Sequence, residues 1–282
     1  MIDIAIVGYG FVGKAVSHGF NRENVRQTII DPYHPMGQDI SVLKDKNIKA
    51  TFICVPTPMG ENGVIDANIV EDVMEYLNEN VSGLKILKST VIPDIIAKFA
   101  NDEKFVYNPE FLTERNANDD FINGIMHIFG CSNEDVANEM QVLYHNYSNC
   151  NIAMPMHVMT PIEASLVKYG INSFLATKVA WFNQFYDLVN QYGSDYDHII
   201  NAIGCDSRVS ASHTKVPGPD GQRGFSGACF PKDTAAIYSA AKKNNIELSI
   251  LKEAIIYNQV LKNNDQIDAR ANEQNVSFNL EL

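Results

Sequence analysis

The first half of the 282-residue sequence alternates short apolar runs with segments of helical periodicity. The apolar runs that predict strands, each followed by a turn or a helix, are 2–7, 28–30, 50–55, 84–88 and 105–107. Strands that alternate with helices in this way pair in parallel and carry helices on both faces of the sheet. The alternation therefore predicts a doubly wound α/β domain, which strands at 125–129 and 151–154 and a helix between them at 133–147 would extend.

After Thr160 the pattern changes to helix only. Pro161 suits a first helical turn and no breaker follows Gly170, so a single helix is predicted from residue 161 to about 191. A Gly- and Pro-rich loop is expected at 207–226, and further helices are predicted near 196–203, 232–244 and 248–263. We therefore expect three parts, namely a doubly wound domain at 1–157, an all-helical domain with one long central helix at 158–264, and a polar tail at 265–282 whose composition favours disorder.

Charge and cysteine content exclude several classes of protein. The formal net charge of −12, from 34 acidic and 22 basic residues, argues against broad electrostatic binding to nucleic acid or anionic membranes. No apolar run approaches the roughly 20 residues of a membrane span, and no basic leader precedes the first strand. The five cysteines are scattered and form no C-x-x-C pair, which indicates neither a disulfide framework nor a zinc site. We expect a soluble cytoplasmic protein without a metal.

A glycine motif, Gly8-Tyr9-Gly10-Phe11-Val12-Gly13, follows the first predicted strand and opens a helix. The first glycine makes the turn, the second lets the backbone approach a pyrophosphate, and the third lets helix and strand pack closely. Asp31 ends the next strand, where a carboxylate accepts hydrogen bonds from an adenosine ribose and repels a 2′-phosphate. The pattern predicts a Rossmann-like site that prefers NAD to NADP, although Asp31-Pro32 is also a common way to begin a turn.

Three polar segments follow predicted strands, at 54–58, 89–91 and 108–110. In a doubly wound sheet ligands bind beyond the carboxyl ends of the strands, so these segments are expected to meet at one crevice. Taken individually, Pro56 and Pro58 indicate only a stiff loop, and Thr90 indicates only a helix cap.

Two pairs of polar residues are spaced four apart. Lys168 and Asn172 share one face of the long helix, where a cation and an amide could stabilise a substrate oxyanion or form an ordinary solvated pair. Glu110 and Glu114 have the same spacing after a strand end, and like charges so placed indicate either a site or simple exposure.

Cys229 stands at the start of a predicted helix, after a glycine-rich approach. Pro231 suits the first turn, and a thiolate at a helix N-terminus is stabilised by backbone N–H groups and the helix dipole, so Cys229 could be nucleophilic near neutral pH. Asp233 lies one turn further on, where it could accept a proton from water or from a sugar hydroxyl. The alternative is a buried structural cysteine beside a capping aspartate.

These motifs occur together in one known family. The segments 8–13, 54–58, 89–91, 108–112, 168–172 and 227–233 stand in the order found in the UDP-glucose/GDP-mannose dehydrogenase family, which the sequence resembles over roughly residues 1–262. The resemblance implies a homodimer that oxidises a nucleotide-sugar C6 alcohol to a carboxylate with two NAD, through a thiohemiacetal and then a thioester at Cys229.

The resemblance also implies roles for individual residues. Thr90, Glu110 and Glu114 match the family's water-positioning and proton-handling residues, Lys168 and Asn172 its oxyanion donors, Asp233 its base, and Arg208 an arginine supplied across the dimer interface. NAD contacts are implied for Gly8, Gly10, Phe11, Val12, Gly13, Asp31, Val55, Pro56, Thr57, Thr90 and Lys232. Substrate contacts are implied for Glu110, Phe111, Leu112, Lys168, Asn172, Arg208 and Gly227.

The sequence departs from the family in three respects. Ser226 and Ala228 stand where the family usually has Gly and Ser, and the loop at 217–223 looks longer. The family also continues into a second α/β domain that grips the UDP. We therefore expect a short form, in which the long loop and a neighbouring subunit hold the nucleotide or the substrate differs.

Two other functions fit parts of the sequence. A 3-hydroxyacid or 6-phosphogluconate-type dehydrogenase resembles it in the N-terminal sheet, the long helix and the Lys-x-x-x-Asn pair, but needs no thioester. A non-catalytic NAD-binding module is the other alternative. Cys229 followed by Pro231-Lys232-Asp233 separates these hypotheses, because a simple alcohol oxidation gives a cysteine no role.

Overall fold

The computed structural model describes residues 1–262 and 269–280, which fall into two compact units. The first unit comprises Met1–Thr57 and Asp66–Lys168, and the second comprises Pro58–Ile65 and Tyr169–Leu282. The expected boundary between residues 157 and 158 falls inside strand β7 (Met156–Met159), which pairs with the sheet of the first unit. The two units instead divide within helix α6 (Pro161–Gln191).

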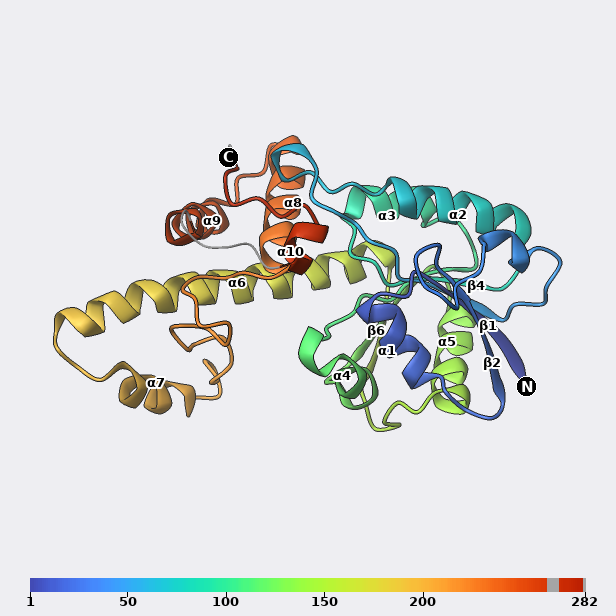
Figure 1. Ribbon diagram of the computed structural model, residues 1–282, viewed down its shortest axis with the longest axis horizontal. Coiled ribbons are helices and arrows are strands. Elements are labelled where there is room, and N and C mark those ends of the chain that lie inside the picture. Colours follow the sequence, from blue (N-terminus) through green and yellow to red (C-terminus); the bar gives the residue numbers. More distant parts are fainter. Residues whose placement is uncertain (263–268, 281–282) are drawn as a thin grey trace. The chain divides into compact units, whose positions relative to one another are not determined.

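The first unit contains a seven-stranded sheet in the order β2-β1-β3-β4-β5-β6-β7 (Figure 1). The strands β1 to β5 pair in parallel, whereas β6 runs antiparallel to β5 and parallel to β7. The predicted doubly wound sheet is therefore confirmed, with its last two strands reversed. The remaining strands are β1 (Ile2–Val7), β2 (Val25–Ile30), β3 (Ala50–Ile53), β4 (Leu84–Leu87), β5 (Phe105–Tyr107) and β6 (His127–Cys131).

The strand expected at 151–154 is wrong, because a turn occupies these residues. The Asn151 side chain accepts a hydrogen bond from the N–H of Ala153 at 3.0 Å, and the Asn151 carbonyl accepts one from Met154 at 2.9 Å. An asparagine that bonds its own downstream backbone favours a turn over a strand. The last strand, β7, begins only after this turn.

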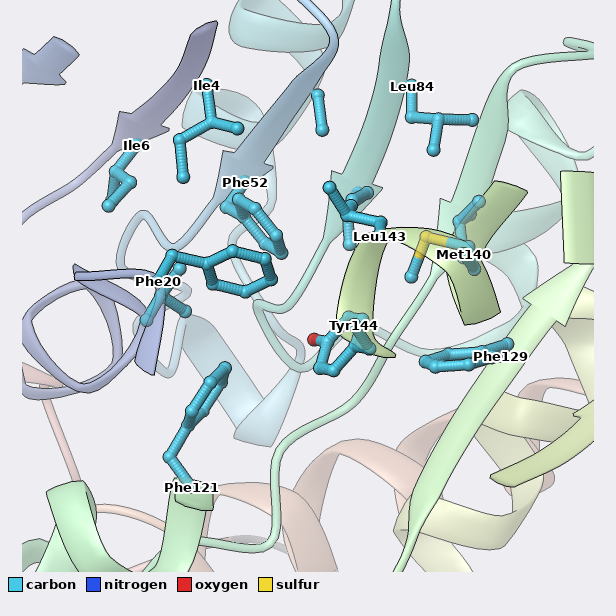
Figure 2. Close-up of a cluster of buried hydrophobic side chains, with 14 of the residues drawn as sticks. Ile4, Ile6, Phe20, Phe52, Leu84, Phe121, Phe129, Met140, Leu143 and Tyr144 are labelled. Atoms are coloured by element: carbon cyan, nitrogen blue, oxygen red, sulfur yellow. The ribbon is translucent and has the colours of Figure 1, made fainter. Parts of the chain in front are cut away.

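Helices cover both faces of the sheet (Figure 1). Helices α1 (Phe11–Gly19), α4 (Ala117–Asn123) and α5 (Glu134–Tyr147) pack on one face, and α2 (Asn68–Asn80) and α3 (Pro93–Phe99) pack on the other. Figure 2 shows the core of the first face, where aromatic and aliphatic side chains point toward one another. Phe20 packs edge-on against Tyr144 with ring centroids 5.4 Å apart, and Phe52 is tilted against Phe20 at 4.8 Å. This core fixes the strand ends from which the polar segments emerge.

The second unit is helical apart from its loops. Helix α6 has the predicted limits, although Ile162 and Leu166, whose spacing helped to predict it, are 40% and 50% exposed. Its buried residues Ala176 and Ala180 pack with Phe225 and with Ala254. The other helices are α7 (Tyr196–Gly204), α8 (Phe230–Lys243), α9 (Ser249–Lys262) and α10 (Ala269–Glu273), and the short 3-10 helices of the two units are η1 (Ile40–Leu43), η2 (Glu61–Gly63) and η3 (Glu114–Asn116).

The C-terminal segment was expected to be a disordered polar tail at 265–282. Residues 263–268 and 281–282 lie outside the described part of the chain, and between them the expectation is wrong. Helix α10 forms there, Ala271 and Val276 are buried, and the N–H of Met59 donates to the carbonyl of Gln274 at 2.8 Å. Buried side chains and hydrogen bonds to its backbone thus hold this segment within the second unit.

Two broader properties concern the described residues alone. No helix among them is both long enough and apolar enough to cross a membrane. They also contain no group of three or more His, Cys, Asp or Glu side chains that could hold a metal ion.

Candidate active site

The glycine motif forms a tight turn between β1 and α1. Gly8 has φ of +87°, and a Cβ there would lie 2.6 Å from the carbonyl oxygen of Cys54. A Cβ on Gly13 would lie 2.1 Å from the carbonyl oxygen of Gly8, so neighbouring backbone excludes a side chain at both positions. A Cβ on Gly10, the residue before α1, would meet no described atom within 4 Å. The helix N-terminus is thus open beside Gly10, as a pyrophosphate requires, and Phe11 and Val12 form its first turn.

Asp31 follows β2, and its carboxylate faces the glycine turn. One oxygen accepts a hydrogen bond from the N–H of Tyr9 at 2.7 Å, and the other accepts one from the N–H of Tyr33 at 2.9 Å. The bond to Tyr33 forms the turn that was the alternative explanation of Asp31-Pro32. The carboxylate therefore begins a turn and also lies beside the dinucleotide motif. A negative charge in this position favours a ribose hydroxyl over a phosphate.

The polar segments after β3, β4 and β5 lie along one edge of the sheet, because these strands are parallel neighbours. Their side chains are buried at Val55, Thr57, Thr90 and Glu110. The hydroxyl of Ser89 donates to the carbonyl of Val55 at 2.7 Å, which ties the first segment to the second. Pro56 belongs to the same first segment, between Val55 and Thr57.

Lys88, a buried lysine that directly follows β4, was not among the predicted site residues. Its ammonium donates to the side-chain oxygen of Asn108 at 3.0 Å and to the carbonyl of Asn108 at 3.1 Å. The Tyr144 hydroxyl donates to the same side-chain oxygen at 2.6 Å. Burial lowers the pKa of Lys88 to about 8 and raises the pKa of the neighbouring Cys54 thiol to about 12. A lysine that ends an otherwise apolar run is the signal that could have identified it.

Four residues form what we call the Glu110 cluster: Glu110, Phe111, Leu112 and Lys168. The ammonium of Lys168 donates to the backbone carbonyl of Glu110 at 2.6 Å and to its carboxylate at 3.2 Å. The other carboxylate oxygen accepts the N–H of Leu112 at 2.7 Å. The ammonium also lies 5.2 Å from the centre of the Phe111 ring. Lys168 and Glu110 are both buried, so Lys168 does not belong to the solvated surface pair that the sequence left open.

Glu114 does not share the environment of Glu110. It begins η3 and is exposed, whereas Glu110 lies in the irregular segment before it. The spacing of four therefore does not place the two carboxylates on one helical face. The cause is local, because Asp120 accepts hydrogen bonds from both the N–H and the hydroxyl of Thr113 and so turns the chain just before Glu114.

Three residues of the second unit form the Asp233 cluster: Asn172, Lys232 and Asp233. The amide of Asn172, on α6, donates to one carboxylate oxygen of Asp233 at 2.6 Å. The ammonium of Lys232 donates to the other oxygen at 2.7 Å. All three side chains are buried, and Asp233 is only 1% exposed. Lys232, expected to contact NAD, is thus the partner of Asp233 in this structure.

Cys229 directly precedes α8, which begins two residues earlier than predicted. The residue is half-buried, Pro231 lies in the first turn, and the N–H of Asp233 donates to the carbonyl of Cys229 at 2.8 Å. Gly227 has φ of +76°, and a Cβ there would meet no described atom within 4 Å. The thiol therefore lies where the helix dipole favours negative charge, with Asp233 on the first turn of the same helix.

Arg208 belongs to the second unit. Its side chain is 87% exposed and pairs with Asp206 two residues earlier, with a shortest distance of 2.6 Å. Within this subunit it contacts none of the other predicted site residues described above. An exposed arginine is compatible with action on a second subunit.

Two successive segments of the chain match two domains of one known family. Residues 38–148 match the NAD binding domain of the UDP-glucose/GDP-mannose dehydrogenase family, and residues 162–260 match the central domain of that family. The UDP-glucose 6-dehydrogenase of Rickettsia bellii is 32% identical over 223 residues, which cover 76% of this chain and 50% of that protein. The chain thus spans about half the length of the curated relatives it matches first.

Solved structures agree at the level of fold. A UDP-glucose dehydrogenase from Pyrobaculum islandicum has a TM-score of 0.75 at 28% identity, and the match covers 92% of this chain and 68% of that one. The 3-hydroxyisobutyrate dehydrogenase of Mycobacterium tuberculosis has a TM-score of 0.70 at 17% identity, and the match covers 97% of this chain and 99% of that one. The second match shares only the architecture.

Proposed function

We propose, because the chain belongs to the UDP-glucose/GDP-mannose dehydrogenase family, that it oxidises the C6 alcohol of a nucleotide sugar to the uronic acid, as in the conversion of UDP-glucose to UDP-glucuronate. The cofactor of this family is NAD, and the turn at Gly8 to Gly13 with Asp31 beside it has the form that the cofactor requires. Two NAD molecules would bind in succession, and each would accept one of the two hydrides that the oxidations release.

The position of Cys229 carries the proposal. Its thiolate adds to the carbon of the intermediate aldehyde, and the resulting alkoxide takes up a proton to give a thiohemiacetal. The second oxidation converts this adduct to a thioester. Water then attacks the thioester carbon, the C–S bond breaks, and the product leaves as a carboxylate while the thiol re-forms. Retention on the enzyme explains how one site performs both oxidations without releasing the aldehyde.

Polar groups buried within each unit supply the remaining functions. Lys168 and Asn172 are one turn apart on α6 and donate to the alkoxide oxygens that form during the reaction. Glu110 or Asp233 accepts the proton of the attacking water, and Thr90 positions that water. The hydroxyacid-type alternative would leave Cys229, Asp233 and Lys232 without a role.

Stoichiometry across a panel of nucleotide sugars tests the function directly. We expect two NADH for each sugar consumed with the preferred substrate, and no free aldehyde in the product. One NADH per molecule, with free aldehyde or ketone released, would contradict the proposal. Calorimetric titration should also show tighter binding of NAD than of NADP, because Asp31 repels a 2′-phosphate.

We also propose that the chain forms a homodimer through α6. Phe174, Trp181 and Leu188 are each more than half exposed, and spacings of seven residues keep them on nearly one side of the helix. A Cβ added to Gly170, on the same side, would meet no described atom within 4 Å, so a second copy could approach the backbone closely. Light scattering should give twice 31.4 kDa for the wild type and a lower mass for Trp181→Glu. A monomer at micromolar concentration would contradict the dimer.

A further inference from the structure

The segment that leads to Cys229 is held by two buried asparagines. Asn258, on α9, contacts Phe225 twice: its side-chain oxygen accepts the N–H of Phe225 at 2.7 Å, and its amide donates to the Phe225 carbonyl at 2.9 Å. Asn183, on α6, accepts the N–H of Gly224 at 3.1 Å. Asn258 is 2% exposed and Asn183 is 1% exposed. The backbone of this irregular loop is thus hydrogen-bonded to side chains, where the backbone of a strand would be hydrogen-bonded to a neighbouring strand.

The fit around Gly224 shows how closely Asn258 approaches the loop. Gly224 has φ of +76°, and a Cβ there would lie 2.3 Å from the side-chain oxygen of Asn258. The ring of Phe225 is buried with Ala176 and Ala180 of α6 and Ala254 of α9. Backbone and side chain of Phe225 are therefore both held, the first by hydrogen bonds and the second by packing.

Cys229 lies between two anchored phenylalanines. Phe225 precedes it by four residues, and Phe230 follows it and packs against the same apolar cluster. Between them, Gly227 adopts a positive φ with open space around it, which lets the chain turn. The path of residues 226–229 is therefore held at both ends and by the hydrogen bond that the Ser226 hydroxyl donates to Asp220, and Asn258 makes the two backbone hydrogen bonds that fix the first end.

We propose that Asn258 is a positioning residue for Cys229. It holds both polar groups of the Phe225 backbone, and so keeps the thiol at the N-terminus of α8 rather than in a mobile loop. This inference rests on the proposed function only in so far as Cys229 is the nucleophile. Asn258 itself acts through the loop, and all the contacts that carry the inference lie within the second unit.

Three variants test the inference. Asn258→Leu removes both hydrogen bonds at similar volume, and Asn258→Asp keeps the acceptor for Phe225 N–H while it loses the donor. The matched control is Leu251→Ala on the same helix, which opens a space against Tyr238 and Ile255 and lowers the melting temperature without touching Phe225. All three are measured at a temperature well below their melting transitions.

The first readout is the rate of alkylation of Cys229 by iodoacetamide, followed by peptide mass spectrometry from pH 6 to 9 without sugar or NAD. We expect the pH profile of Asn258→Leu to move up towards that of an ordinary thiol, with Asn258→Asp between it and the wild type. We expect Leu251→Ala to keep the wild-type profile. The same profile in Asn258→Leu as in Leu251→Ala would overturn the inference.

The second readout is steady-state kinetics. A displacement of the nucleophile by about 1 Å can cost on the order of 10²-fold in rate, so kcat of Asn258→Leu should fall by about that factor while KM for NAD stays unchanged. A wild-type kcat in Asn258→Leu would overturn the inference. If the wild type releases aldehyde yet the alkylation profile still shifts in Asn258→Leu, the proposed function fails and the positioning of Cys229 by Asn258 stands.

Discussion

The Glu110 cluster and the Asp233 cluster both bury a carboxylate beside a lysine, but they hold it differently. Lys168 makes its shorter bond, 2.6 Å, to the backbone carbonyl of Glu110 and its longer one, 3.2 Å, to the carboxylate. Asp233 is held tightly at both oxygens, by Asn172 at 2.6 Å and by Lys232 at 2.7 Å. The other Glu110 oxygen accepts the N–H of Leu112 at 2.7 Å, so the long contact with Lys168 is the weak one in this cluster, and Lys168 keeps its bond to the backbone carbonyl if that contact is lost.

In the proposed mechanism this difference suits the two carboxylates to different tasks. A proton acceptor needs an oxygen that can turn to the water it activates, and the Glu110 oxygen 3.2 Å from Lys168 is the most loosely held of the four. Asp233 is better placed to orient Asn172 and Lys232 beside the start of α8. We therefore propose Glu110 as the base, whereas the sequence resemblance implied Asp233, and the Glu110→Gln variant below tests this choice.

The largest effect is expected from Lys168→Ala. Removal of a donor that stabilises a developing oxyanion typically costs about 10²–10³-fold in rate, so kcat should fall by that factor. Lys178→Ala is a matched control on the same helix, because Lys178 also donates to a backbone carbonyl, that of Val209 at 2.7 Å. A wild-type kcat in Lys168→Ala would contradict the oxyanion-stabilising role and indicate that Lys168 is structural.

Two isosteric substitutions separate the clusters further. In Asp233→Asn the buried Lys232 loses its counter-charge, and breaking a buried pair typically costs about 3–5 kcal/mol of unfolding free energy. In Glu110→Gln the loss should be smaller, because Lys168 keeps its bond to the Glu110 carbonyl, whereas turnover should stop at the thioester. Urea unfolding measures the loss of unfolding free energy, and trapping of the acyl-enzyme shows whether turnover stops at the thioester. Equal stability losses would contradict the difference between the clusters.

The dinucleotide turn offers a smaller and separable effect. Gly13→Ala drives a Cβ into the Gly8 carbonyl and should destabilise the fold by about 1–3 kcal/mol. Gly10→Ala meets no described atom and should leave the unfolding midpoint unchanged, while NAD binds about tenfold more weakly, equivalent to ~1.4 kcal/mol. An unchanged NAD affinity in Gly10→Ala would contradict binding of the NAD pyrophosphate at this turn.

The last effect is a pH dependence that arises from Lys88. Its pKa falls from an ordinary 10.5 to about 8 on burial, so between these values the unfolded chain binds more protons than the folded one. The contribution of Lys88 to the unfolding free energy therefore rises as pH increases through this window and is constant below it. The difference in unfolding free energy between wild type and Lys88→Met should change from pH 8 to pH 10. If this difference in unfolding free energy stayed constant from pH 8 to pH 10, it would contradict the lowered pKa of the buried Lys88.

Local patterns predicted most of the fold. Pro161 at the start and an unbroken helical period gave the limits of α6, and apolar runs located the first five strands. A strand was predicted at 125–129, where β6 lies, but its antiparallel direction and the turn at Asn151 were missed, because both depend on hydrogen bonds that periodicity does not report. The alternation of strands and helices predicted a parallel sheet. It carries no information on whether a strand near the edge of that sheet runs antiparallel to its neighbour.

The sequence indicated candidate site residues but not the contacts that they make. Cys229 and Asp233 could be recognised because they are neighbours in sequence at the start of one helix. The partners of Lys168 and Asn172 lie 58 and 61 residues away, and Asn258 reaches Phe225 across 33, so these pairs arise only when the chain folds. Polar residues at buried helical positions, such as Asn183 and Asn258, were the one available signal.

The most direct test of the thioester mechanism is intact-protein mass spectrometry of Cys229→Ser after incubation with NAD and UDP-glucose. A serine ester is hydrolysed far more slowly than a thioester, so we expect a burst of NADH followed by a protein that carries the sugar acid covalently. Cys229→Ala should lose the second oxidation and still bind NAD. An unmodified Cys229→Ser protein, together with unchanged turnover in Cys229→Ala, would contradict the thioester mechanism and favour a simple hydroxyacid-type oxidation.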